Sequence, residues 1–193
     1  MILYLIRHGK DDDNIRGGWS HHSLTEKGKQ QALDLAAFLK LKNDINIHRV
    51  YSSDLPRSME TAEEIARQYG LTVIALPQFR EVNNGDLAGM SNVLAAKRFP
   101  KLYWNLIEWN QAYPHGESPK AFYERILTAW IDFSHSILKQ NRDCILVTHG
   151  GVLQIILSFV NGIPYNNKEL YRKIQPCEII ALKYEDDTWI EIK

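Results

Sequence analysis

Short apolar runs alternate along the chain with segments of helical periodicity. Two runs, Ile2 to Ile6 and Cys144 to Val147, are apolar at consecutive positions, as strands covered on both faces are. Shorter strands and a C-terminal hairpin, which turns through Glu185-Asp186-Asp187, complete the β pattern. These further strands are predicted at Arg49 to Ser52, Thr72 to Leu76, Glu178 to Tyr184 and Thr188 to Ile192.

Between these strands, apolar residues recur at the spacing of helices that bury one face. Thr25 is a plausible N-cap of the first helix. Ser118 caps the longest helix, and Pro119 occupies its first position. The stripes comprise Gly28, Ala32, Leu35, Ala36 and Leu39; Met59, Ala62, Ala66 and Tyr69; Phe122, Ile126, Ala129, Trp130, Phe133 and Ile137; and the nearly all-apolar run Val152 to Val160.

Alternating strands and helices predict an α/β layer fold. The length of 193 residues suits one domain, which we take to span 1–193. The helical pattern between Asn92 and Pro114 is irregular. We therefore interpret the region around 91–117 as a helical insertion over one edge of the core. Its aromatic residues, from Tyr103 to Tyr113, either pack on the core or contact a substrate.

Charge and cysteine content exclude several classes of function. Lys plus Arg and Asp plus Glu each total 23, so neither a nucleic acid nor a membrane is an expected partner. The apolar N-terminus is too short for a signal peptide, and the cytoplasm is the predicted location. No cysteine pair has zinc-type spacing, and we interpret the run Asp11 to Asp13 as a solvated loop, so no metal is expected. The sequence does not indicate an oligomeric state.

Candidate catalytic residues directly follow two apolar runs that end in similar motifs. The first run leads into Arg7-His8-Gly9, and the second leads into His149-Gly150-Gly151. Because ligands of open α/β sheets bind beyond the carboxyl ends of the strands, His8 and His149 should face one crevice. The helix that starts near Gly150 would aim free N–H groups at an anion there.

The segments that follow two further predicted strands add an arginine and a carboxylic acid. Pro56 at a helix start places Arg57 in the first helical turn, near the same strand ends. Glu81 follows the strand that ends near Leu76. An imidazole can attack phosphorus, guanidinium groups can hold phosphate oxygens, and a carboxylic acid can protonate a leaving alkoxide. These residue types together indicate phosphoryl transfer to an enzyme nucleophile.

The motifs resemble those of the histidine phosphatase superfamily, which includes the cofactor-dependent phosphoglycerate mutases, over nearly the whole chain. The family's Arg-His-Gly matches Arg7-His8-Gly9, and its late His-Gly-Gly matches His149-Gly150-Gly151. Other family motifs match in the expected order. They are the loop before a Leu-Thr-x-x-Gly helix start at Asn14 to Gly28, a Ser-x-x-x-Arg-x-x-x-Thr-Ala segment at Ser53 to Ala62, an acidic site at Glu81 to Gly89, and Gly116-Glu117-Ser118.

The resemblance implies a fold of three αβα layers around a mostly parallel sheet, as in phosphoglycerate mutase. It implies His8 as the phosphorylated nucleophile and Glu81 as the proton donor, and it implies no metal; no cofactor is expected. It also implies Arg7, Arg57 and His149 as phosphate ligands, with Asn14 as an additional one. The residues themselves leave Asp86 or Asp11 as alternative donors, and the helix start adds Gly150 to the phosphate-binding set.

The expected function is a metal-independent phosphatase that converts a small phosphorylated metabolite into an alcohol and inorganic phosphate. A mutase-type isomerase and a non-catalytic phosphate-binding module are the alternatives. Mutases of this family carry a longer insertion with an Arg-Arg and Pro-rich stretch, which is absent between Glu81 and His149. Lys10, Asp11 and His21 also depart from the family's usual residues, so the entrance to the predicted substrate site differs from that of typical family members.

Overall fold

The computed structural model describes residues 1–42 and 45–192. Within these ranges, six strands form one sheet in the order β3-β2-β4-β1-β5-β6. Strands β1 to β4 are mutually parallel, β5 runs antiparallel to β1, and β6 antiparallel to β5. The predicted α/β fold with a mostly parallel sheet is therefore confirmed. The strands are β1 (Ile2–Arg7), β2 (Arg49–Ser52), β3 (Val73–Ala75), β4 (Cys144–Thr148), β5 (Ile179–Glu185) and β6 (Thr188–Ile192).

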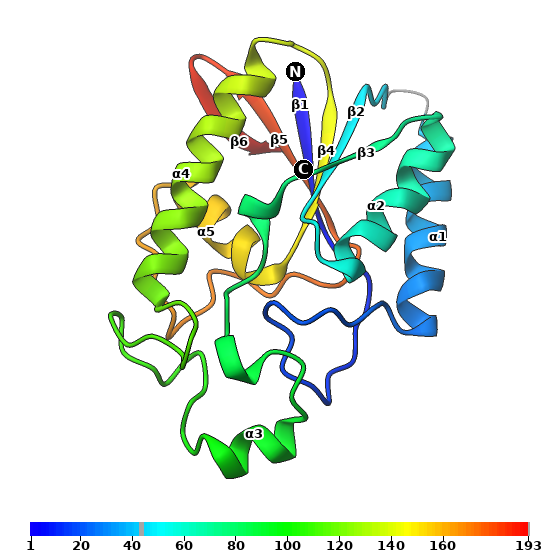
Figure 1. Ribbon diagram of the computed structural model, residues 1–193. Coiled ribbons are helices and arrows are strands. Elements are labelled where there is room, and N and C mark those ends of the chain that lie inside the picture. Colours follow the sequence, from blue (N-terminus) through cyan, green and yellow to red (C-terminus); the bar gives the residue numbers. More distant parts are fainter. Residues whose placement is uncertain (43–44, 193) are drawn as a thin grey trace.

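Helices cover both faces of the sheet (Figure 1). Helices α1 (Glu26–Leu41) and α2 (Pro56–Tyr69) lie on one face, and α4 (Pro119–Leu138) and α5 (Gly150–Val160) on the other. Alternate residues of β1 enter the two cores. Leu3 and Leu5 pack with α4 and α5, whereas Tyr4 and Ile6 pack with α1 and α2. Burial on both faces explains why this strand is apolar at every position from Ile2 to Ile6.

The buried stripe of α2 differs from the predicted one. Met59 and Tyr69 are only half-buried, while the polar residues Ser58 and Thr61 are fully buried. Ser58 Oγ donates a hydrogen bond to the Val147 carbonyl at 3.0 Å, and Thr61 Oγ1 accepts one from the Gly9 N–H at 3.0 Å. These bonds compensate the burial of the hydroxyls, so an apolar stripe alone could not locate the buried face.

The C-terminal hairpin is confirmed with a tighter turn than expected. Glu185 pairs with Thr188 as a strand residue, so only Asp186 and Asp187 form the turn. Both have positive φ angles, 50° and 60°. A two-residue hairpin loop with positive φ at both positions matches the twist of the flanking strands, and aspartate tolerates that conformation.

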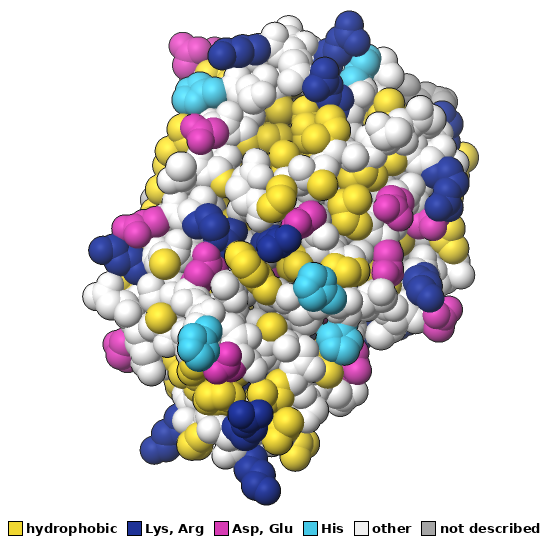
Figure 2. Space-filling model, viewed as in Figure 1, with side chains coloured by type: hydrophobic (Ala, Val, Ile, Leu, Met, Phe, Trp, Pro, Cys, Tyr) yellow, Lys and Arg dark blue, Asp and Glu magenta, His cyan; other side chains and the backbone are white. Residues whose placement is uncertain are grey.

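The segment after β3 extends beyond the carboxyl ends of the parallel strands (Figure 1). It contains the short 3-10 helices Pro77–Phe79 and Gly85–Leu87 and the helix α3 (Asn92–Arg98). Leu87, Ala95, Ile107 and Tyr113 form a small core of their own. Figure 2 shows exposed hydrophobic side chains beside Lys and Arg side chains over α3, at the lower end of the molecule.

The most apolar helix of the described chain is α5, with 11 residues. Its residues Val152 to Ser158 are all buried between α4 and the sheet. In residues 1–42 and 45–192, no helix is both long and apolar enough to cross a lipid bilayer.

Candidate active site

His8 follows directly after β1, at the carboxyl edge of the sheet, and only 4% of its surface is exposed. Its Nδ1 atom lies 2.7 Å from the carbonyl oxygen of Gly9. Because a carbonyl only accepts, Nδ1 carries the proton. In a neutral ring the lone pair is then on Nε2, which leaves that nitrogen able to act as a nucleophile.

The surroundings keep His8 neutral. Burial lowers the pKa of His8 to about 3, and the nearby Arg57 and Arg7 guanidinium groups act in the same direction. The Asp11 carboxylate opposes this shift only in part. Burial, Arg57 and His8 likewise hold the pKa of His149 well below its usual value. Both imidazoles are therefore uncharged at neutral pH.

Arg57 lies in the first turn of α2, as predicted, and is 1% exposed. Its Nη2 donates to the Gly18 carbonyl at 2.8 Å, and its Nη1 donates to the Ser20 carbonyl at 3.3 Å. Its Nε lies 3.4 Å from a carboxylate oxygen of Asp11. The loop before α1 thus holds the guanidinium group in one orientation.

Arg7 and His149 come from neighbouring strands. Arg7, the last residue of β1, pairs in register with Thr148, the residue before His149. Arg7 Nη1 donates to the Ile174 carbonyl at 2.7 Å. The rings of His149 and His8 lie 5.1 Å apart, and His149 Nε2 is 2.8 Å from the Ser53 hydroxyl. The two strands are neighbours, and the two histidine rings lie in contact at their ends.

Three ring or guanidine nitrogens at this edge of the sheet are buried. Arg7 Nε, Arg57 Nε and His149 Nδ1 have no hydrogen-bond partner among the described residues. Buried polar groups are nearly always paired, so these nitrogens are ready for a bound ligand. Two of them belong to cationic side chains, which favours an anion.

Backbone N–H groups orient the Glu81 carboxyl group. Val82 N–H donates to Oε1 and Gly151 N–H donates to Oε2, each at 3.0 Å. A Cβ atom on residue 151 would lie 2.3 Å from Glu81 Oε1, so this contact requires glycine. The second glycine of the His-Gly-Gly segment therefore makes room for the acid at the start of α5.

These groups surround a cavity of about 480 Å³ at the strand ends. His8 and Glu81 line it together with Arg7, Arg57 and Gly150. His149 contacts His8 but is not among the lining residues. Asn14 is exposed and bonds to Asp12 through its backbone and amide nitrogens, at 2.9 and 2.8 Å, away from the cavity. The structure thus groups five of the seven predicted site residues around one space.

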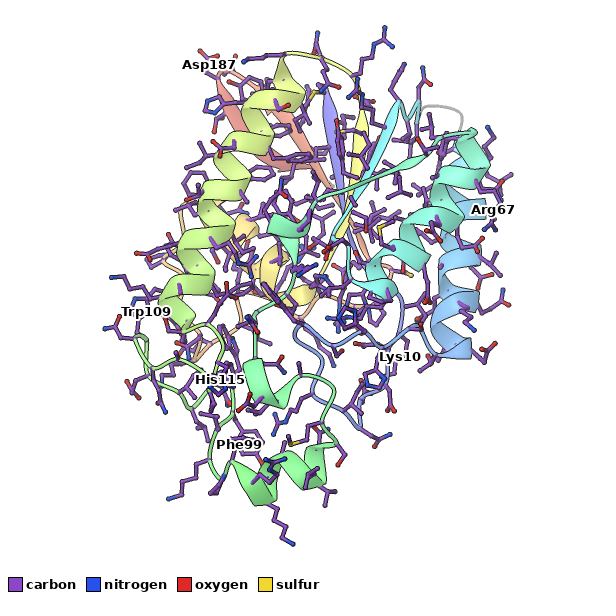
Figure 3. All side chains as sticks on the ribbon, in the orientation of Figure 1. Lys10, Arg67, Phe99, Trp109, His115 and Asp187 are labelled. Atoms are coloured by element: carbon purple, nitrogen blue, oxygen red, sulfur yellow. The ribbon has the colours of Figure 1, made fainter. Side chains whose placement is uncertain are left out.

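The alternative acids occupy different places. Asp11 lines the cavity beside Arg57. Asp86 is absent from the lining, and its carboxylate lies 2.9 Å from Nδ1 of the exposed His115, which is labelled in Figure 3. Of the three acids considered from the sequence, Glu81 and Asp11 therefore line the cavity and Asp86 does not.

Sequence reasoning missed the residues that support Glu81. Trp19 Nε1 donates to the Glu81 carbonyl at 2.7 Å, and Arg125 Nη2 donates to the same oxygen at 3.1 Å. Arg125 is held in turn by Glu117, with Nε and Oε1 2.6 Å apart. The Gly-Glu-Ser segment thus supplies more than the Ser118 helix cap, because its glutamate fixes the arginine behind the acid.

Sequence reasoning also missed one whole side of the cavity. Eight of the ten residues 165–174, between α5 and β5, line the cavity, and no motif or periodicity marked this segment. Gln154 fastens this segment to α5, because its Oε1 accepts the Tyr171 N–H at 3.0 Å.

The site can bind an anion and transfer a group to nitrogen. It combines a neutral imidazole, the buried Arg57 and half-buried Arg7 guanidinium groups and an oriented carboxyl group in one cavity. Across residues 1–42 and 45–192, no cluster of three or more His, Cys, Asp or Glu side chains is arranged to hold a metal ion.

Comparisons with known proteins show the family of this chain. A family model for the histidine phosphatase superfamily (branch 1) matches residues 3–192, and the chain belongs to that superfamily. A probable phosphoglycerate mutase of Erwinia tasmaniensis is 30% identical over 98% of this chain and 88% of its own. The α-ribazole phosphatase of Shigella flexneri has a TM-score of 0.84 at 25% identity, covering 100% and 95% of the two chains.

A further structural neighbour is a mycobacterial glucosyl-3-phosphoglycerate phosphatase solved with vanadate. Its TM-score is 0.79 at 23% identity, with 99% of this chain and 96% of that chain covered. The fold of this chain is thus the phosphoglycerate mutase-like fold expected from the sequence. Its relatives include proteins named as mutases and as phosphatases, which leaves the reaction to be argued from the site.

Proposed function

We propose that the protein is a metal-independent phosphatase that hydrolyses small phosphomonoesters through a phosphohistidine on His8. The observation that carries the proposal is the state of His8. Its Nδ1 proton is held by the Gly9 carbonyl, and its ring is neutral and lines a cavity with Arg7 and Arg57. We place this activity in the cytoplasm, as the sequence predicts.

The first step transfers the phosphoryl group to the enzyme. Nε2 of His8 attacks phosphorus while the bond to the ester oxygen breaks, and Glu81 gives its proton to the leaving alkoxide. Arg7 and Arg57 balance the charge on the phosphoryl oxygens, with His149 and the N–H groups around Gly150 as further ligands. The buried Arg57 and the half-buried Arg7 supply the positive charge that a metal ion supplies elsewhere.

The second step returns the enzyme to its starting state. Glu81, now a carboxylate, takes a proton from a water molecule that attacks phosphorus. The bond between phosphorus and Nε2 breaks, and inorganic phosphate leaves. The oriented Glu81 thus acts first as acid and then as base, which requires that its carboxyl group stay fixed between Val82 and Gly151.

A mutase is the second candidate, because curated relatives at 30% identity bear the name probable phosphoglycerate mutase. In a mutase, an alcohol of the substrate, and not water, takes the phosphoryl group back. The same His8, Arg7 and Arg57 would serve both reactions. The fate of the phosphoryl group therefore decides between the two reactions.

The test is phosphate release from a panel of phosphomonoesters in the presence of a chelator, beside His8→Ala. We expect release by the wild type and none by the variant. A parallel assay follows interconversion of 3-phosphoglycerate and 2-phosphoglycerate. Isomerisation without phosphate release would favour the mutase, and loss of activity in chelator would contradict metal independence.

A further inference from the structure

The cavity has room for much more than a phosphate group. Its volume of about 480 Å³ falls in the range of sites for whole organic ligands. His8, Arg7 and Arg57 occupy one end. The remaining lining mixes polar side chains with apolar ones, and we call four of the apolar side chains the apolar wall. The apolar wall consists of Val82, Trp104, Tyr165 and Leu170.

The apolar wall joins two distant parts of the chain through one buried amide. Asn167 is 5% exposed, and its Nδ2 donates to the carbonyls of Trp104 at 2.7 Å and Ile107 at 2.9 Å. Lys168 Nζ also donates to the Ile107 carbonyl at 2.9 Å. These bonds fasten the segment around Tyr165 to the insertion that carries Trp104.

Aromatic packing fixes the two rings of the apolar wall. Trp104 stacks on Tyr113, with ring centroids 6.4 Å apart, and meets the edge of Phe122 at 5.7 Å. Tyr165 stacks on Tyr123 at 5.5 Å. Both rings are thus held before any ligand binds, which lowers the entropic cost of binding.

Trp109 lies on the far side of this packing. It contacts Tyr165 at 6.2 Å and sits at the outer edge of the molecule, beside the start of α4 (Figure 3). Trp104 therefore lines the cavity, whereas Trp109 supports Tyr165 from outside.

Leu170 has no such packing. Its side chain is 69% exposed although it lines the cavity. An apolar side chain in that position gains stability only when a ligand covers it. The apolar wall therefore offers both fixed aromatic rings and an uncovered aliphatic group to a ligand at His8.

The charged side chains near the apolar wall are mostly paired with, or balanced by, opposite charges. Arg172 is paired through its two Nη atoms with Glu178 at 2.9 Å and Glu191 at 2.7 Å, and its buried Nε has no hydrogen-bond partner among the described residues. Lys173 and Glu169, both exposed in the lining, carry opposite charges. A substrate with a carboxylate or second phosphate would find no net positive charge at this end.

We propose that the apolar wall binds the alcohol part of the substrate, and that the substrate is a phosphomonoester whose alcohol carries a flat, apolar group, such as an aryl or arylalkyl group. This inference rests on the proposed function, because it assumes a phosphate ester seated at His8. It assigns to Trp104, Tyr165 and Leu170 the selection of the leaving group.

Binding of two phosphonates, measured by calorimetry, tests the inference without turnover. Benzylphosphonate and methylphosphonate share the anionic group and differ in the ring. We expect benzylphosphonate to bind the wild type about tenfold or more tightly. Equal affinities would overturn the inference and leave the phosphatase proposal standing. If neither phosphonate nor inorganic phosphate binds, the anion site of the proposed function fails, and the inference fails with it.

Variants test whether the apolar wall causes the preference for benzylphosphonate over methylphosphonate. Leu170→Ser should reduce the ratio of the two affinities at least about threefold. Because Leu170 is exposed, this change should leave the fold intact. Leu41→Ser is the matched control, because Leu41 is 80% exposed and lies outside the cavity. Trp104→Ala should bring the ratio close to one. An unchanged ratio in Leu170→Ser, or an equal fall in the control, would refute the assignment.

Discussion

The carboxylate of Asp11 lies 3.4 Å from Nε of Arg57, inside the cavity that His8 also lines. A phosphate group bound at His8 would approach the same guanidinium group. Asp11 is thus an internal anion that competes with substrate and product for Arg57. Its side chain is 20% exposed, so the interaction is screened by solvent only in part.

Replacing Asp11 should strengthen phosphate binding. In Asp11→Asn, the negative charge beside Arg57 is lost, so we expect the inhibition constant of inorganic phosphate at pH 7 to fall roughly five- to tenfold. Asp12→Asn is the control, because Asp12 is exposed in the same loop and does not line the cavity. Lost turnover with unchanged phosphate affinity would instead identify Asp11 as the proton donor.

Glu81→Gln should separate substrates by their leaving groups. Alkyl phosphates need a proton on the departing oxygen, whereas p-nitrophenyl phosphate leaves readily without one. We expect kcat/KM to fall on the order of a hundredfold or more for an alkyl ester and less than about tenfold for p-nitrophenyl phosphate. An equal loss on both esters would reject Glu81 as the acid.

Gly151→Ala should act through Glu81. The added Cβ would lie 2.3 Å from Glu81 Oε1 and displace the carboxyl group. Kinetics of the single and double variants form a cycle with Glu81→Gln. We expect Gly151→Ala to lower kcat/KM for alkyl esters at least about tenfold alone, and to add little when Glu81 is already replaced. Additive losses would show that residue 151 acts independently of the acid.

Some elements could be predicted from the sequence because burial alone determines their pattern of apolar residues. Both faces of β1 are covered, so the run Ile2 to Ile6 is apolar throughout, and this run predicted the strand. The buried face of α2 was misread because Ser58 and Thr61 are buried through hydrogen bonds to distant backbone groups. Such compensation depends on tertiary contacts that an apolar stripe does not encode.

At the candidate active site, too, short motifs could be predicted, whereas residues positioned by tertiary contacts could not. Short motifs after strands predicted His8, Arg57 and Glu81, since parallel strands bring their carboxyl ends to one edge. The apolar wall was not predicted in full. Trp104 was noted only as one aromatic residue of the insertion. Tyr165 and Leu170 lie in an irregular segment placed by the Asn167 amide, whose acceptors are backbone carbonyls at Trp104 and Ile107.

The stability of the protein should depend on pH through His8. Its pKa is about 3 in the folded state, below the ordinary value of 6.5, chiefly because of burial. Between these values the unfolded chain binds the extra proton, so the free energy of unfolding rises as pH rises through this window and is flat above it. His149 adds to the effect in the same direction.

Urea unfolding at pH 7 and pH 5 measures this dependence. For His8 alone, the wild type should lose about 2 kcal/mol more than His8→Asn on going from pH 7 to pH 5. The nucleophile is neutral throughout this range, so kcat/KM should show no acid limb near pH 6.5 that belongs to His8. The same pH dependence in both proteins would mean that His8 is not held neutral by the fold.

Asn167→Ala should loosen the apolar wall and leave the phosphate end intact. The change removes the donor to the Trp104 carbonyl and one of two donors to the Ile107 carbonyl, which keeps its bond from Lys168 Nζ, and one carbonyl left unsatisfied costs roughly 1–3 kcal/mol. Urea unfolding should register that loss. The affinity for methylphosphonate should stay within about twofold of wild type, while the preference for benzylphosphonate falls, because only the aromatic side of the cavity loses its anchor.

Asn92→Ala is the matched control, since the Asn92 amide makes one hydrogen bond, to the Asp13 carbonyl, and lies outside the cavity. If Asn167→Ala weakened both phosphonates equally, the segment around Tyr165 would be supporting the whole cavity and not the leaving-group end alone.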